Sequence, residues 1–142
     1  MKIFLDANIL VAVLNRQYPL FTYAAKILSL SENKKFQLYT SPICLAIAFY
    51  FAEKKSGTQR AKEKIAILSE KLKITSTDSE VVRTTVINRK INDFEDGLEY
   101  YSALNFGCEI IITEDTGDFY FAEIPVYNSE YFLESVVNSV LK

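Results

Sequence analysis

Apolar and polar positions follow two different patterns along this chain, one typical of buried strands and one typical of helices. Short apolar runs predict strands buried on both faces, and they occur at residues 2–5, 36–39, 109–113 and 125–127, with a weaker one at 74–75. Helical spacing of apolar residues occurs at residues 8–14, 20–31, 42–55, 58–72, 78–89, 93–104 and from 129 onward. Strands alternating with helices predict an α/β fold, with a central parallel sheet and helices on both faces.

Helix boundaries can also be read from individual residues. Ser41-Pro42 predicts a helix start, because serine is a good N-cap and proline suits the first helical position. Asn92 or Asp93 should cap the helix predicted at residues 93–104, and Gly107 should end that helix. We expect its inner face to carry Phe94, Leu98, Tyr101 and Leu104, and we expect Ser129 to cap the final helix.

Acidic residues lie where predicted strands end. Asp6 follows the first strand, Glu114-Asp115 follow the strand of three isoleucines, and Asp93, Glu95 and Asp96 open a helix. Residues just beyond the carboxyl ends of parallel strands face one crevice. Three carboxylates gathered there would repel one another by about 3 kcal/mol per pair at 6 Å and an effective dielectric of 20. A bound cation would remove this cost, so the pattern predicts a metal site.

Each acid also has a purely structural interpretation. Asp6 could cap the next helix, and acids at 93, 95 and 96 suit the helix dipole of a first turn. Asp118, beside Gly117, is typical of a turn. Thr113 and Asp115 should point to the same side of the strand end, with Glu114 pointing away. The combination is more specific than any of its members.

Composition bounds the function. At 142 residues with 49% apolar residues, the chain should form one domain, residues 1–142, with a sizeable core. It has no histidine, which excludes a Ser-His-Asp triad and a HExxH zinc site. Its four glycines are too widely spaced for a phosphate-binding loop. Oxygen ligands therefore remain, and carboxylates suit Mg²⁺ or Mn²⁺.

Charge is unevenly distributed. Residues 53–73 carry seven basic and three acidic residues, whereas residues 93–134 carry eleven acids and no lysine or arginine. The basic stretch could attract anions, or could be an ordinary solvated helix face.

Cys44 and Cys108 lie in apolar runs and should be reduced and buried, as in a cytoplasmic protein. The apolar stretch 36–52 is too short to predict a membrane span, and Asp6 interrupts the only N-terminal apolar run.

Three motifs in this order resemble the PIN domain family, and in particular the VapC-like toxins. They are Phe4-Leu5-Asp6-Ala7-Asn8, Asp93-Phe94-Glu95-Asp96-Gly97 and Ile111-Ile112-Thr113-Glu114-Asp115 through Asp118. The resemblance implies a three-layer fold with about five strands, Mg²⁺-dependent (or Mn²⁺-dependent) ribonuclease activity and a small antitoxin partner. By position it implies that Asp6, Asp96 and Asp115 are the catalytic metal ligands. Asn8, Asp93, Thr113 and Asp118 would support them.

The chain departs from the family pattern at one position. The family usually has a further acid, often Glu, early in the helix after the second strand, and here the aligned residue is Ile47. Glu53 lies six residues further along, about 9 Å away on a helix. It is a poor substitute.

The sequence, with this resemblance, therefore predicts an endoribonuclease toxin. The backbone of its RNA substrate would be held by Lys54, Lys55, Arg60 and Lys62. The alternative is a PIN-fold module that binds RNA or protein with impaired catalysis. A phospho-acceptor receiver domain is disfavoured, because Asp6 has no acidic neighbour and residues 91–141 contain no lysine. Aromatic residues such as Tyr18, Tyr23, Tyr50 and Tyr120 could form a homodimer or antitoxin interface, or simply pack in the core and its rim.

Overall fold

A five-stranded parallel sheet forms the centre of the protein, and the computed structural model describes all of residues 1–142. The strand order is β3-β2-β1-β4-β5, and every neighbouring pair is parallel. The strands are β1 (Lys2–Leu5), β2 (Gln37–Thr40), β3 (Lys73–Ile74), β4 (Ile110–Ile112) and β5 (Val126–Tyr127). The sequence prediction of an α/β fold with about five parallel strands is confirmed.

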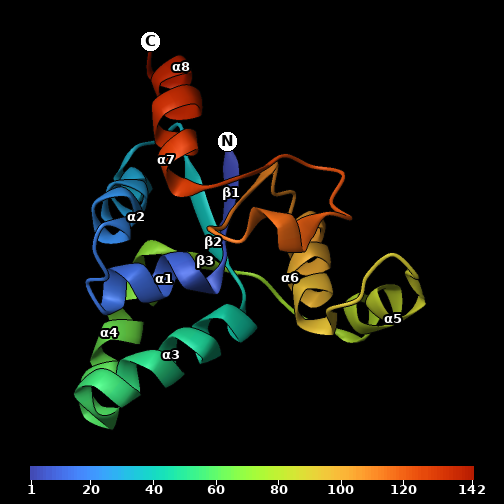
Figure 1. Cartoon of the computed structure of the whole chain (residues 1–142), viewed down its shortest axis with the longest axis horizontal. Coiled ribbons are helices and arrows are strands. Elements are labelled where there is room, and N and C mark those ends of the chain that lie inside the picture. Colours follow the sequence, from blue (N-terminus) through green and yellow to red (C-terminus); the bar gives the residue numbers. More distant parts are fainter.

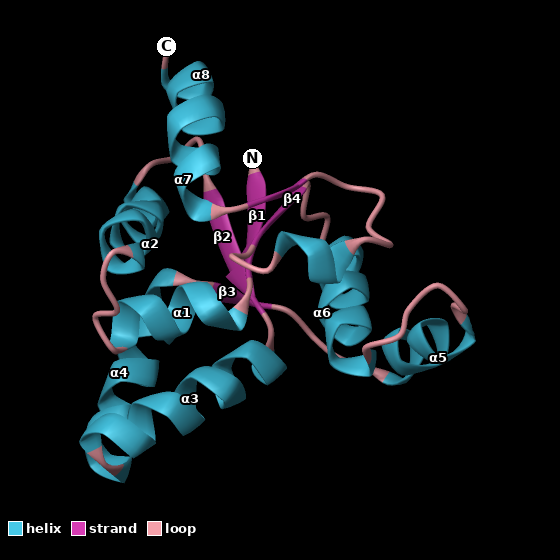
Figure 2. Cartoon of the chain, viewed as in Figure 1, coloured by secondary structure: helices cyan, strands magenta, loops and turns pink.

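Helices cover both faces of this sheet. Figure 1 shows α1 and α2 on one side, and α5 and α6 on the other. The helices are α1 (Ala7–Leu14), α2 (Leu20–Ser29), α3 (Pro42–Ser56), α4 (Thr58–Lys71), α5 (Ser79–Ile87), α6 (Phe94–Asn105), α7 (Ser129–Tyr131) and α8 (Asn138–Leu141). A π-helical turn, η3 (Phe132–Val137), joins α7 and α8, and single 3₁₀ turns lie at η1 (Leu30–Glu32) and η2 (Thr116–Phe119). Figure 2 shows the strands enclosed by these helices.

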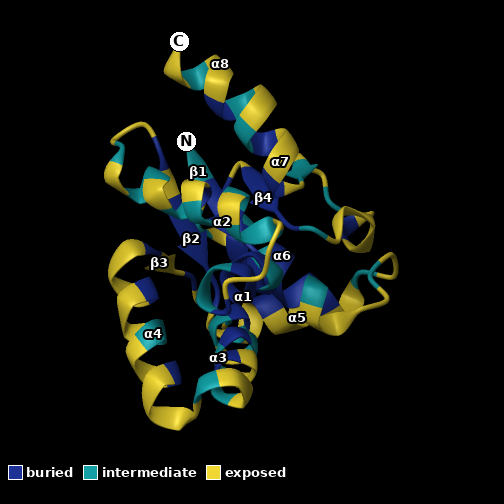
Figure 3. Cartoon of the chain, turned by 60° about the vertical axis from the view of Figure 1, so that its left-hand side comes forward, coloured by how far each residue is buried: buried dark blue, intermediate teal, exposed yellow.

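The two central strands are the most deeply buried part of the chain. Ile3, Phe4 and Leu5 of β1 and Ile111 and Ile112 of β4 have no exposed surface. A strand covered on both faces has no need of polar alternation, which is why both segments read as unbroken apolar runs. Figure 3 shows that this burial is confined to the sheet and the inward helix faces, whereas α4 is largely exposed.

The order of the strands places a switch point between β1 and β4. The chain runs outward from β1 to β2 and β3, and then returns across the sheet to β4 and β5. Connections leaving neighbouring strands in opposite directions open a crevice at their carboxyl ends. Leu5 pairs with Ile112, so Asp6 and Thr113, the next residue on each strand, lie side by side at this edge of the sheet.

Several predicted boundaries are confirmed and two details are wrong. Ser41 caps α3 through the N–H of Cys44, and Asp93 caps α6 through the N–H of Asp96. Phe94 is 49% exposed rather than on the inner face, because α6 packs through Leu98, Tyr100 and Ala103. The final helix is capped by Asn128 instead of Ser129.

Both cysteines are free and buried, as predicted. No helix combines the length and the hydropathy that crossing a membrane requires.

Close packing of α5 against α6 depends on Gly97. A Cβ atom at this position would lie 2.5 Å from Cγ2 of Thr85 and 2.9 Å from Cγ2 of Ile91. We expect Gly97→Ala to lower the free energy of unfolding by about 1–3 kcal/mol through overpacking, although alanine is the better helix former. Urea denaturation measures this. Gly117→Ala is the matched control, because nothing lies within 4 Å of its Cβ, and an equal loss there would contradict the packing argument.

Candidate metal centre

A cavity opens at the carboxyl edge of the sheet, at the switch point between β1 and β4. Its volume is about 380 Å³. The residues that line it include no lysine or arginine, and they are Asp6, Ala7, Asn8, Val11, Gln17, Ile47, Phe51, Asp93, Glu95, Asp96, Glu99, Asp115 and Asp118. The structure therefore brings together all three predicted ligand acids and three of the four predicted supporting residues in one concave surface.

Asp6 is held rigidly at the floor of this cavity. It is 8% exposed, and its Oδ1 accepts a hydrogen bond of 2.6 Å from the N–H of Ala7, which caps α1. Its Oδ2 accepts a hydrogen bond of 2.8 Å from Thr113 Oγ1. The capping interpretation and the site interpretation both apply to this residue.

Thr113 and Asn8 connect the ends of β1 and β4. Asn8 Nδ2 donates to Thr113 Oγ1 at 3.0 Å and to Asp115 Oδ2 at 3.2 Å. Thr113 is fully buried beneath the lining residues. Glu114 points away from the cavity and accepts hydrogen bonds from the backbone N–H and the hydroxyl of Ser129. The alternation predicted for residues 113–115 is thus observed.

The first turn of α6 supplies a second group of acids. Asp93 Oδ1 accepts from the N–H of Asp96 at 3.1 Å, so it has the predicted capping role while also lining the cavity. Asp96 is half-buried and Glu95 is exposed. Asp118 reaches the cavity from η2.

Burial and like charge raise the pKa values of two of these acids. Burial, followed by repulsion from Asp93, Asp6, Asp118 and Glu95, raises the pKa of Asp96 to about 7. Burial and repulsion from Asp93 and Asp6 also raise the pKa of Glu95. Without a cation, the site therefore relieves its repulsion partly by binding protons.

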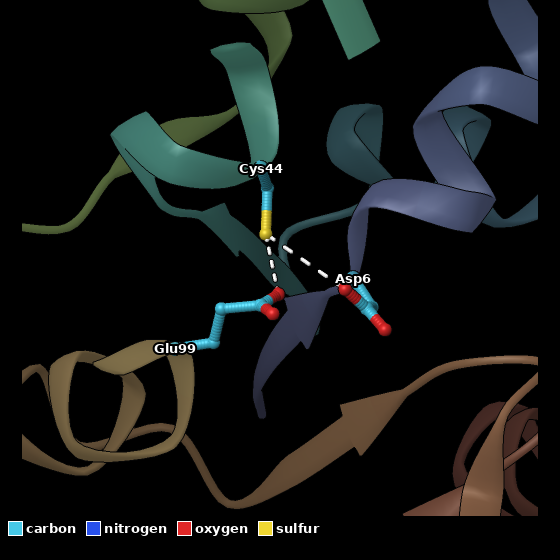
Figure 4. A group of neighbouring side chains, drawn as sticks. All are labelled: Asp6, Cys44 and Glu99. Atoms are coloured by element: carbon cyan, nitrogen blue, oxygen red, sulfur yellow. Dashed lines mark hydrogen bonds between the residues drawn. The ribbon is translucent and has the colours of Figure 1, made fainter. Parts of the chain in front are cut away.

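Glu99 is the site residue that sequence reasoning missed. It lies one turn beyond Asp96 on α6, is 1% exposed, and lines the cavity. Burial, together with a hydrogen bond to Asp6 and its charge, raises the pKa of Glu99 to about 11. Figure 4 shows the Cys44 thiol above the two acids, where it donates a hydrogen bond to Glu99 and also approaches Asp6. Burial and the charges of Glu99 and Asp6 hold the pKa of Cys44 well above its usual range.

Ile47 lines the same cavity from α3. This is the position at which the family usually has a further acid, and here an apolar side chain borders the acidic cavity. The face of α3 toward the cavity also carries Phe51, so this helix contributes apolar groups and no acid.

The four predicted RNA-binding residues lie outside the cavity. Lys54 and Lys55 are at the C-terminal end of α3, and Arg60 and Lys62 are on α4, all of them exposed. Lys54 lies one turn beyond Phe51, which lines the cavity, and its Nζ is 4.8 Å from the centre of the Tyr50 ring. Lys55 donates a hydrogen bond to the carbonyl oxygen of Asn15.

The donor set fits a hard divalent cation. Asp6, Asp96, Asp115 and Glu99 offer carboxylate oxygens around a cavity without basic groups. Mg²⁺ and Mn²⁺ prefer such oxygen donors and usually keep several waters. Cys44 lies beside this set, with its sulfur within 4.8 Å of ligand atoms of Asp6 and Glu99, and its thiol donates a hydrogen bond to Glu99.

Comparison with known proteins identifies the family. A family model described as PIN domain matches residues 2–117, and the chain belongs to the PIN domain family. It is 27% identical to the ribonuclease VapC1 of Aquifex aeolicus (strain VF5) over 139 residues, which cover 94% of each chain.

Solved structures share the fold at low sequence identity. VapBC-1 from nontypeable Haemophilus influenzae matches with a TM-score of 0.68 and 16% identity, covering 92% of this chain and 99% of that one. VapBC2 from Rickettsia felis, bound to a DNA fragment from its promoter, gives 0.67 and 20%, with coverages of 90% and 98%. VapC20 of Mycobacterium tuberculosis, a toxin that cleaves the sarcin-ricin loop, gives 0.66 and 20%, with coverages of 86% and 95%.

Glu99 should make the metal-free protein less stable at high pH. Its carboxyl keeps a proton in the folded chain up to about pH 11, but an unfolded glutamate loses it above about pH 4.5. The folded state therefore binds more protons, and the free energy of unfolding should fall by up to about 1.4 kcal/mol per pH unit as the pH rises between these values. Glu99→Gln should flatten this decline, measured by urea denaturation with chelator from pH 6 to pH 9. Parallel curves for the two proteins would contradict the assigned protonation.

Proposed function

We propose that this chain is a Mg²⁺- or Mn²⁺-dependent endoribonuclease, formed by residues 1–142 as one domain, and the toxin of a toxin–antitoxin pair. The observation that carries the proposal is the convergence of Asp6, Asp96 and Asp115 on one cavity that contains no basic residue. Membership of the PIN domain family and similarity to VapC1 support it.

Asp6, Asp96 and Asp115 would hold the cation. When bound, it supplies a water of lowered pKa and neutralises charge that develops on the phosphate. Asn8 and Thr113 fix the two carboxylates at the strand ends through the hydrogen bonds described above. Asp93 positions Asp96 by capping α6. Asp118, which lines the cavity from η2, would support the ligand acids.

The RNA backbone would be held by the basic end of α3 and the start of α4. Lys54 and Lys55 lie one turn beyond Phe51 at the edge of the cavity, and Arg60 and Lys62 extend the positive surface away from it. Such contacts are with phosphates and give affinity without reading the base sequence. Tyr50 and Phe51, which are 52% and 43% exposed, offer aromatic surfaces on which unpaired bases could stack.

A small antitoxin is the proposed protein partner. Two of the similar structures are VapBC complexes, and one of them is bound to promoter DNA. Tyr18 and Tyr120 are 71% and 57% exposed and are candidates for contacts with an antitoxin or with a second copy of the chain, where aromatic residues are enriched.

A second candidate function is a PIN-fold binding module with impaired catalysis. Ile47 favours it, because α3 contributes no acid to the cavity. The two functions differ in one observable: the module binds RNA and leaves it intact.

Metal binding should stabilise the protein and permit cleavage. We expect Mn²⁺ at about 100 times its Kd to stabilise the folded state by about 2.7 kcal/mol, and a single-stranded RNA to be cleaved in Mn²⁺ but not in chelator. Asp6→Asn combined with Asp96→Asn should abolish the stabilisation and lower the cleavage rate at least about 100-fold. Melting curves and RNA gels measure the two effects. A double mutant that keeps the full response to Mn²⁺ would refute the site, and metal binding without cleavage would favour the binding module.

Phosphate contacts should appear in the salt dependence of RNA binding. Replacing Lys54 and Lys55 by alanine removes two candidate contacts, so log K should fall less steeply with log salt, by a slope of about 1.4 for single-stranded RNA. Filter binding at several salt concentrations, with the catalytically inactive double mutant as the background, gives the slope. Lys71→Ala combined with Lys142→Ala is the charge-matched control. An unchanged slope would place the RNA elsewhere.

A further inference from the structure

Glu99 is a buried acid without a basic partner. The only ion pair in the protein joins Lys71 and Glu32, at 3.8 Å, and no lysine or arginine lines the cavity. A buried carboxyl group is usually compensated by a counter-charge or by several hydrogen bonds. Glu99 instead contacts another acid, Asp6, and the weak donor Cys44. Its surroundings leave room for a positive charge and do not supply one.

Glu99 lies beside the part of the cavity that α3 lines, and α3 provides no acid there. Cys44 lies one turn before Ile47, and it is the α3 residue that touches the carboxyl group of Glu99. Ile47 and Glu99 line the same cavity from facing helices. Figure 4 shows that the Glu99 side chain crosses from α6 toward α3 and ends beside Asp6.

We propose that Glu99 is the fourth acid of the metal centre and supplies, from α6, the carboxylate that the family places on α3 at position 47. This inference rests on the proposed metal-dependent function. Asp96 and Glu99 are three residues apart on one helix, so both project toward the same region from successive turns. The site would then combine Asp6 and Asp115 from the strand ends with two acids from α6 and none from α3.

Cys44 acts as a positioning residue in this arrangement. Its thiol donates to Oε1 of Glu99 and approaches Oδ1 of Asp6 at 3.9 Å. Because one oxygen of Glu99 is held by the thiol, the carboxyl group is kept near Asp6 instead of rotating toward solvent. Ser41 and the N–H of Cys44 form the cap that fixes this first turn of α3.

A purely structural role makes a different prediction. If Glu99 only fills the core as a neutral hydrogen-bonding group, its amide analogue should bind metal as the wild type does. Glutamine has nearly the same volume, and it can accept from Cys44 and donate to Asp6. Glu99→Gln therefore removes the acid while keeping the packing.

The test is calorimetric titration of Mn²⁺ into the full-length wild type, Glu99→Gln, and the double variant Ile47→Glu with Glu99→Gln. Glu70→Gln, an exposed substitution on α4 with the same change in net charge, is the control. We expect Glu99→Gln to weaken Mn²⁺ binding at least about tenfold, the lower end for groups that support a metal site. Glu70→Gln should bind as the wild type does. The double variant should recover most of the lost affinity, because it returns an acid to the α3 position.

Each result has one meaning. Wild-type affinity in Glu99→Gln, with binding abolished by Asp6→Asn and Asp96→Asn, would overturn the role of Glu99 and leave the proposed metal centre intact. No Mn²⁺ binding by the wild type would overturn both. If Glu99→Gln fails to fold, a crystal structure of the wild type with Mn²⁺ decides the question. A Glu99 oxygen within about 2.3 Å of the ion supports the proposal, and a carboxyl group still facing Cys44 alone refutes it.

Discussion

The parallel pairing of β1 with β4 is the constraint on which the rest of the structure depends. It places Leu5 beside Ile112, and the backbone N–H of Asp6 donates to the carbonyl oxygen of Ile112 at 3.0 Å. A shift of one residue in this register would turn Asp6 or Thr113 into the core. The all-apolar strands that make the register stable thus also place two polar residues side by side at the edge of the sheet.

Concentrated negative charge follows from that register. Acids from the ends of β1 and β4, the first turn of α6 and η2 share a cavity of about 380 Å³. Without a cation, the cavity limits repulsion by holding protons, as the pKa of about 7 for Asp96 indicates. The two helix N-termini that meet the cavity, at α1 and α6, add partial positive charge from their backbone N–H groups. The fold therefore accommodates these acids, although the Coulomb repulsion between their carboxylates destabilises it.

Most of the site could be predicted from the sequence because it lies next to strand ends, which apolar runs locate well. Asp6, Thr113 and Asp115 were found in this way, and Asn8 and Asp96 through the family motif. Glu99 was missed because it lies in the middle of a helix and its burial depends on how α6 turns toward the sheet. That rotation was misjudged, since Phe94 was expected inside and is exposed. An acid one turn after Asp96, beside the apolar residues Leu98 and Tyr100, was the available signal.

Asp6 carries a further consequence of the fold. Each of its oxygens already accepts a hydrogen bond, one from the N–H of Ala7 and one from the Thr113 hydroxyl, and the Cys44 thiol lies 3.9 Å from Oδ1. The rotamer of Asp6 is fixed before any ligand arrives, and the entropy of ordering it is a cost of folding rather than of binding. The candidate centre is thus preorganised at Asp6, and the hydrogen bond from the N–H of Ala7 also caps the first helix of the chain.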